Sequence, residues 1–203
     1  MTESYYKLCL KELESIKKPQ KLLLHSCCAP CSSQVITFLT KYFDITILYY
    51  NPNISPIEEY NKRKEEQIRL INSIDTINKL NIIDCDYDND IYENKIKGYE
   101  EEPERGARCN ICYELRLRKT AEIANEKKYD YFCSTLSVSP YKNAILINQL
   151  GEKLGKEYKI KWLYSDFKKD DGYKKSIELS KKYNLYRQDY CGCIHSKKKN
   201  VMD

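Results

Sequence analysis

Short apolar runs alternate with longer amphipathic stretches along this chain. The runs are rich in Leu, Ile, Phe and Tyr, and they predict strands at residues 21–26, 44–50, 81–85, 129–134 and 159–164. Between them, apolar residues three or four positions apart predict helices at residues 32–41, 56–80, 89–98, 109–128, 141–156 and 172–183. Strands that alternate with helices indicate an α/β fold, with a parallel sheet covered by helices on both faces.

Local signals mark the start of two of these helices. Ser55 is expected to be an N-cap, with Pro56 at the first helical position and Glu58 and Glu59 in the first turn. Asp88 is expected to cap a brief helix that ends near residue 98. No repeat or linker interrupts the pattern. We therefore expect one domain over residues 1–203, with a polar leader at 1–20 and a basic tail at 197–203.

Length and composition narrow the class of protein. The chain has 203 residues, of which 41% are hydrophobic, enough for the core of one medium domain and too many for a disordered chain. No run approaches the about 18 consecutive apolar residues of a membrane span, and charged residues occupy the start of the chain, where a signal peptide would be apolar. We expect a cytoplasmic protein without a membrane partner.

Cysteine is the residue type that points to chemistry. Seven of the ten cysteines fall in three clusters, Cys27-Cys28-Ala29-Pro30-Cys31, Cys109-Asn110-Ile111-Cys112 and Cys191-Gly192-Cys193. In a reducing compartment such thiols are typical of metal ligands or redox groups rather than structural disulfides. Four thiolates suit structural zinc or an iron–sulfur cluster equally well. Seven clustered thiols exceed what a closed zinc site uses, which leaves three for an open metal site or a redox pair.

The predicted topology brings these clusters together. Ligands of such folds bind beyond the carboxyl ends of the strands, and the first two clusters and the loop at residues 134–142 follow predicted strands. The last cluster reaches this edge only if the C-terminal segment folds back. Cys191 and Cys193 are then either a strained, easily reduced disulfide or a pair of metal ligands. Cys9, Cys85 and Cys133 stand alone and are expected to be buried and inert.

Charge and arginine usage favour a phosphate-bearing partner. The chain has 35 Lys and Arg against 30 Asp and Glu, a net charge of +5, and 19 Tyr that could stack on bases. Only seven of the basic residues are Arg, and five of these lie within ten residues of the second or third cysteine cluster. Our candidate substrate-binding residues are Tyr60, Arg63, Arg105, Arg108, Tyr141, Lys142 and Arg187.

Five motifs, in order, resemble the QueH family of cobalamin-independent epoxyqueuosine reductases. They are HSCCAPC (25–31), YNPNISPIEEYNKR (50–63), ERGARCNICYELRLRKTA (104–121), STLSVSPYKN (134–143) and SDFKKDDGYKKSIELSKKYNLYRQDYCGC (165–193). The resemblance implies reduction of epoxyqueuosine to queuosine at the wobble position of tRNA, the last step of queuosine biosynthesis. It also implies a fold similar to that of the adenine-nucleotide α-hydrolases, and a [4Fe-4S] cluster.

Carried over to this chain, the family pattern implies Cys27, Cys28, Cys109 and Cys112 as cluster ligands. Spacing alone would pair Cys28 with Cys31, and we follow the family because some members have Asp at the position of Cys31. Carboxylate suits a separate iron better than a cubane. Cys31, Cys191 and Cys193 are therefore candidates for a mononuclear iron beside the cluster, and the last two are alternatively the redox pair.

The expected reaction turns an epoxide into an alkene with loss of water, which takes two electrons and two protons. One cubane normally cycles by one electron, so a second centre or a second delivery is required. An open iron could polarise the epoxide oxygen. Asp166, Tyr141 and Lys142 are candidate proton donors, and Cys31, Cys191 and Cys193 are the thiols expected to take part in catalysis.

The absence of two nucleotide-binding motifs limits the cofactors that we expect. Neither the SGGxDS phosphate loop nor G-x-G-x-x-G follows a predicted strand, so we expect no ATP and no NAD, and no cobalamin from the resemblance. Electrons must then come from an external donor protein. Two alternatives remain open at this stage. One is a zinc-stabilised RNA-binding module without catalysis, and the other is a tRNA sulfur-transfer enzyme, which would usually need ATP.

Overall fold

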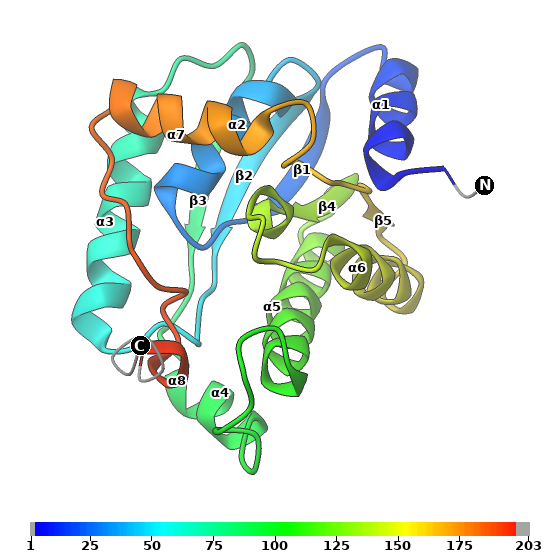
Figure 1. Ribbon diagram of the computed structural model, residues 1–203. Helices are drawn as coiled ribbons and strands as arrows, with labels where there is room; N and C mark the ends of the chain where they lie inside the picture. The colour runs from blue at the N-terminus through cyan, green and yellow to red at the C-terminus, as the bar shows by residue number, and fades with distance from the viewer. Residues whose placement is uncertain (1–2, 198–203) are drawn as a thin grey trace.

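The sheet of this protein is five-stranded and wholly parallel (Figure 1). The structure is a computed structural model that describes residues 3–197. The strands lie in the order β3-β2-β1-β4-β5, so the first strand is central. They are β1 (Gln20–His25), β2 (Phe43–Tyr49), β3 (Leu80–Asp84), β4 (Tyr131–Ser134) and β5 (Lys161–Trp162). The predicted α/β class is confirmed, and each predicted strand overlaps an observed one.

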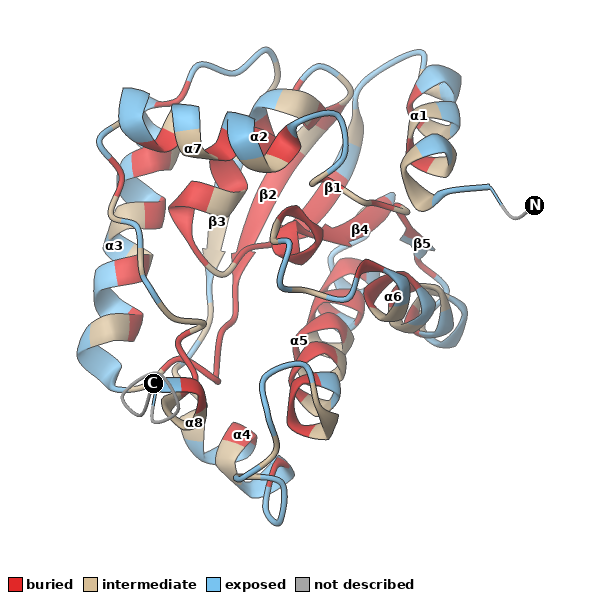
Figure 2. Ribbon diagram, viewed as in Figure 1, coloured by how far each residue is buried: buried red, intermediate tan, exposed pale blue. Residues whose placement is uncertain are grey.

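The central strand is apolar because neighbouring elements cover both of its faces. Leu22, Leu23 and Leu24 are all buried. Leu24 pairs in register with Ile47 of β2 on one side and with Cys133 of β4 on the other. Burial is concentrated in the inner strands β1, β2 and β4, and the outer faces of the helices carry exposed residues (Figure 2).

The helices form a layer on each face of the sheet (Figure 1). On one face α2 (Ala29–Leu39) packs against α3 (Ile57–Ser73) and α7 (Gly172–Lys182), and on the other α5 (Ala107–Glu126) packs against α6 (Ala144–Tyr158). Strands β2 and β3 lie on one side of β1 in the sheet, and β4 and β5 lie on its other side. The order reverses at β1, and in doubly wound sheets ligands bind at such a reversal. The remaining helices are α1 (Tyr5–Ser15), α4 (Asn89–Lys95), the 3-10 helix η1 (Thr135–Val138) and α8 (Ile194–Lys197).

The predicted polar leader contains a helix. The Ser4 side chain accepts a hydrogen bond from the Lys7 amide and caps α1, which buries Cys9 and Leu13 against the core. No helix was predicted in this leader, and the structure shows one at Tyr5–Ser15.

Helix α3 is shorter than predicted and starts differently. Pro56 is its N-cap rather than its first helical residue, and the helix ends at Ser73 rather than near residue 80. Beyond it, the Thr40 hydroxyl accepts hydrogen bonds from the amides of Ile77 and Asn78. This contact with the end of α2 draws the backbone out of the helix, and it has no signature in the local sequence.

Other boundaries differ by a few residues. Helix α2 starts at Ala29, because Pro30 occupies its first turn, and α6 starts at Ala144 with the Asn143 side chain as its cap. Helix α8 was not predicted, and most of the predicted basic tail, residues 198–203, lies outside the described residues. Among the described residues, no helix is long and apolar enough to cross a membrane.

After α7 the chain turns back along α3, which meets the condition for the last cysteine cluster to reach the carboxyl edge (Figure 1). We call residues 183–193 the C-terminal strap. Arg69 donates to the carbonyl oxygens of Tyr183 and Asn184, and Glu66 accepts from the amide of Tyr186 at 2.6 Å. These contacts lead the strap along α3 to the carboxyl edge of the sheet.

Candidate active site

A cleft of about 420 Å³ lies at the carboxyl edge of the sheet. Its volume is within the range of pockets that hold small ligands. Its walls come from the loop after β1, from α5, from the segment after η1, and from the C-terminal strap. Its lining residues include Cys27, Cys28, Cys31, Glu104, Arg116, Tyr141, Lys142, Arg187, Gln188, Asp189 and Cys191.

A buried histidine joins the strand ends beneath this cleft. His25 Nε2 lies 3.1 Å from the carbonyl oxygen of Tyr50, and Nδ1 lies 2.9 Å from Ser134 Oγ. A carbonyl only accepts, so Nε2 carries the proton and Nδ1 accepts from the hydroxyl. Desolvation lowers the pKa of His25 to about 4, which keeps it neutral at physiological pH. His25 therefore fixes β1 relative to β4 and to the end of β2.

The first cysteine cluster occupies the start of α2. Cys28 is the N-cap residue, and its Sγ lies 3.9 Å from Sγ of Cys27. Hydrogen bonds from Cys27 and Cys31 hold the pKa of Cys28 well below that of a free thiol, whereas the same contacts raise the pKa of Cys31 well above it. The structure thus brings these three thiols together, with the thiolate favoured at Cys28.

The second cluster lies in the first turns of α5. Cys109 and Cys112 are both buried, and Cys109 Sγ accepts from the amide of Arg105 at 3.3 Å. Desolvation raises the pKa of Cys112 to about 12 and also raises that of Cys109. Without an added positive charge, these two thiols are therefore protonated.

One buried arginine connects all three clusters. The Arg116 guanidinium donates from Nε to the carbonyl of Cys112, and its Nη2 has no hydrogen-bond partner among the described residues. Desolvation lowers the pKa of Arg116, but Cys112, Cys27 and Cys191 in their thiolate forms outweigh it, so that the net shift of the pKa is upward. Arg116 is thus a fixed cation near thiols from three distant segments. Its positive charge would offset the negative charge of thiolates buried there.

The two thiols of the last cluster have different partners. Cys191 Sγ lies 3.2 Å from Lys142 Nζ, which also forms an ion pair with Glu104 at 3.1 Å. Cys193 Sγ lies 3.1 Å from the hydroxyl of Tyr92 in a small apolar cluster that includes Cys112. No disulfide links the described cysteines, all ten of which are free.

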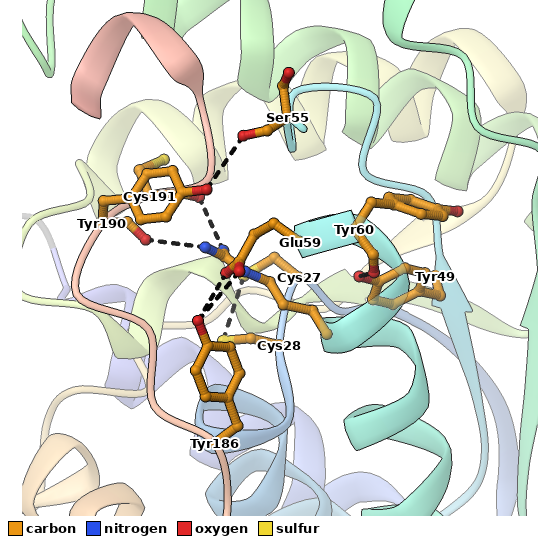
Figure 3. A network of polar contacts seen from close by, with 10 residues as sticks. Cys27, Cys28, Tyr49, Ser55, Glu59, Tyr60, Tyr186, Tyr190 and Cys191 are labelled. Atoms are coloured by element: carbon orange, nitrogen blue, oxygen red, sulfur yellow. Dashed lines mark hydrogen bonds and ion pairs between the residues drawn. The ribbon is translucent and has the colours of Figure 1, made fainter. Parts of the chain in front are cut away.

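The strap is held by an arginine that we expected to bind substrate. Arg63 is buried, and it donates to Glu59 at 2.7 Å and to the carbonyl oxygens of Tyr190 and Cys191. Glu59 also accepts from the hydroxyl of Tyr186, and Figure 3 shows Tyr186, Tyr190 and Cys191 of the strap in one polar network with Glu59, near Cys27 and Cys28. The structure therefore assigns Arg63 to positioning the strap.

Other candidate residues also have contacts away from the cleft. The Tyr60 hydroxyl donates to the carbonyl of Cys85, Arg108 donates to the carbonyls of Glu100 and Glu102, and Asp166 pairs with Lys168. These three candidates organise their own loops and do not line the cleft.

The remaining candidates lie at the cleft. Tyr141, Lys142 and Arg187 line it, and Tyr141 is 58% exposed. Arg105 lies over the Tyr141 ring, with 5.5 Å between its guanidinium carbon and the ring centroid.

Sequence reasoning missed four residues of the site. Arg116 follows Cys112 by one helical turn, so its spacing on α5 could have revealed it. Gln188 and Asp189 immediately precede the last cysteine cluster and line the cleft. Tyr92 meets Cys193 across 101 positions, a contact that leaves no local signal.

The donor chemistry of the site fits an iron centre, because soft thiols surround a buried, partly unpaired guanidinium. Within residues 3–197, no group of three or more His, Cys, Asp or Glu side chains is already arranged around one point to hold a metal ion. Several thiols are engaged with Lys142, Tyr92 or one another. Binding a metal would exchange these contacts for coordination.

Comparisons with known proteins agree with this description. Residues 22–199 match the family model described as epoxyqueuosine reductase QueH. Epoxyqueuosine reductase QueH of Staphylococcus epidermidis is 46% identical over 187 residues, 90% of this chain and 79% of that protein. The Streptococcus pyogenes protein of the same name is 41% identical over 95% of this chain and 75% of its own length. The one from Thermotoga maritima is 33% identical over 86% and 89%. The chain therefore belongs to the QueH family of epoxyqueuosine reductases, which are oxidoreductases.

Proposed function

We propose that this protein reduces epoxyqueuosine to queuosine in tRNA, in the cleft at the carboxyl edge of the sheet. The observation that carries the proposal is the convergence of thiols from three segments on one buried cation, Arg116, in a member of this family. A zinc-stabilised RNA module would leave the surplus thiols without a role, and the family name does not favour sulfur transfer.

The reaction sets what the site must provide. Two C–O bonds of the epoxide break, an alkene forms, and the oxygen leaves as water after two electrons and two protons are added. An iron–sulfur cluster, when bound, supplies the electrons. The protein must therefore bind the modified nucleoside, place its epoxide beside the thiols and donate protons to the departing oxygen.

The thiols divide into two proposed sets. Cys27, Cys28, Cys109 and Cys112 would hold a [4Fe-4S] cluster, and two of them, Cys27 and Cys112, influence the same guanidinium. Cys31, Cys191 and Cys193 would hold one further iron, or the last two would act as a redox pair. Support for a separate set comes from Cys191, which lines the cleft and contacts Lys142 rather than another thiol.

Lys142 is the donor that we favour for the oxygen. Its ammonium lines the cleft and is held between Glu104 and Cys191. Tyr141 is exposed at the rim, and Asp166 is engaged with Lys168 outside the cleft. The remaining parts of the proposal are an external protein electron donor, the cytoplasm as location, and no use of ATP, NAD or cobalamin.

The test is anaerobic purification followed by iron, sulfide and zinc analysis, with turnover of tRNA that carries epoxyqueuosine. About four iron and four sulfide per chain, or one further iron, together with formation of queuosine, would support the proposal. Zinc without sulfide, after anaerobic reconstitution had also failed, would overturn the redox mechanism.

A further inference from the structure

Two polar groups on the strap lack partners where it lines the cleft. Asp189 is exposed on the cleft wall and makes no hydrogen bond or ion pair with any residue that the structure describes, whereas Oε1 of Gln188 is buried without a hydrogen-bond partner there. A buried acceptor without a partner costs about 1–3 kcal/mol. A ligand that donates hydrogen bonds at this point would remove that cost.

The other carboxylate of the cleft is already paired. Glu104 is bound by Lys142, so Asp189 is the one lining carboxylate without a cation among residues 3–197. The Gln188 side chain lies close enough to Cys28 to contribute to the lowered pKa of that thiol. The Gln188 amide oxygen and the Asp189 carboxylate thus line the same cleft as the thiols, and a cationic hydrogen-bond donor would match them.

The substrate of the proposed function contains one such group. In epoxyqueuosine a secondary amine joins the 7-deazaguanine base to the five-membered ring that carries the epoxide. An alkyl amine of this kind is protonated near neutral pH, which gives it one positive charge and two N–H donors. The hydroxyls and the base edge of the nucleoside are neutral donors, so only the amine matches an unpaired carboxylate in charge.

We propose that Asp189 and Gln188 bind the protonated secondary amine of the substrate, a role that rests on the proposed function. The Asp189 carboxylate accepts one N–H, and Oε1 of Gln188 accepts the other. Since the amine is attached to the ring that bears the epoxide, this contact would hold the reacting carbons near Cys28 and Cys191. Charge-assisted hydrogen bonds of this kind discriminate strongly against neutral analogues.

Binding of anticodon stem-loops tests the proposal without turnover. Three RNAs are compared that differ only at the wobble nucleoside: queuosine, 7-aminomethyl-7-deazaguanosine and guanosine. The first two carry the amine, and guanosine does not. We expect both amine-bearing RNAs to bind about tenfold more tightly than the guanosine RNA, since a hydrogen bond to a charged group is worth at least that factor.

Asp189→Ala and Asp189→Asn should abolish the preference, so that all three RNAs bind with the same affinity. The matched control is Asp75→Ala, which removes the same charge from an exposed aspartate whose one ion pair within residues 3–197 is a 4.0 Å contact with Lys182. Loss of one negative charge alone should tighten binding of every RNA equally. The expected effect of the Asp189 variants on amine-bearing RNA therefore has the opposite sign to that of the control.

Two results would overturn the proposal. One is preferential binding of queuosine RNA while the aminomethyl RNA binds like guanosine, which would mean that the ring hydroxyls are recognised. The other is an unchanged preference in both Asp189 variants. If wild-type protein shows the preference but no reductase activity, the proposed function fails while the amine site stands.

Discussion

Arg63 Nη1 lies 3.2 Å from the carbonyl oxygen of Cys191, a residue 128 positions further along the chain. This hydrogen bond, with the neighbouring one to Tyr190, couples α3 to the loop that carries the last two cysteines. The Arg63 side chain is only 2% exposed, and its salt-bridge partner Glu59 is 13% exposed. The contact is therefore shielded from solvent, so its loss should be measurable both in stability and in the reactivity of Cys191.

Replacing Arg63 with Met should lower the free energy of unfolding by about 3 kcal/mol, since it leaves Glu59 and two carbonyls without their donor. Hydrogen exchange at residues 186–193 should accelerate, and alkylation of Cys191 should become faster. Arg118→Met is the control, because Arg118 is more exposed and its ion pairs lie on α5 and α6. Unchanged exchange in the strap of Arg63→Met would show that other contacts hold it.

Gly192→Ala should reduce both stability and turnover. Its φ is +103°, and an added Cβ would lie 2.9 Å from Ile54 Cγ1 and 3.0 Å from Arg63 Nη1. We expect a loss of about 2–4 kcal/mol from strain and overpacking together.

Gly98→Ala is the matched control for this substitution. Its φ is +87°, with nothing within 4 Å of the added Cβ, so it reports backbone strain alone. Thermal denaturation and kcat of both variants would be compared, and equal effects would argue that the contacts around Gly192 are unimportant.

Cysteine replacements should separate the two proposed sets of thiols. Cys109→Ala should remove the cluster and the activity together, whereas Cys193→Ala should keep about four iron and four sulfide but stop turnover. Cys85→Ala serves as control, because Cys85 does not line the cleft. Iron and sulfide analysis and single-turnover assays give the answer. Normal turnover by Cys193→Ala would refute its role in catalysis.

Leu13→Ala should destabilise the protein by about 2–5 kcal/mol, the cost of removing a buried leucine side chain. Glu14→Ala, on the exposed face of the same helix, should change stability by less than about 0.5 kcal/mol. Urea denaturation of both variants measures the difference. Equal midpoints would mean that α1 contributes little to the core.

The fold was largely predictable because its strands are continuous apolar runs. Leu22 to Leu24 and the run at residues 45–49 need burial on both faces, and a parallel sheet provides it. Helix α1 was missed because only Cys9 and Leu13 of its residues are buried. The end of α3 was misplaced because Thr40, far away in sequence, satisfies the amides beyond it.

The site was predictable as a set of clusters but not as a set of contacts. The spacing of the cysteines in the sequence identifies the three clusters, and the sheet topology explains why Cys27 and Cys28 lie at the same edge as Lys142. No local pattern distinguishes Arg63, whose donors all serve the protein, from Arg187, which lines the cleft. That distinction depends on which carbonyls a side chain meets, a property of the folded state.

The C-terminal strap also has a consequence for assembly. The last strand ends at Trp162, so every strand of the sheet precedes the strap in the order of synthesis. A folding chain can therefore complete the sheet, with the first two cysteine clusters in place, before residues 183–193 dock along α3. Under the proposed function, loading of metal and docking of the strap then become separable stages of maturation, and the second stage adds the strap wall to the cleft.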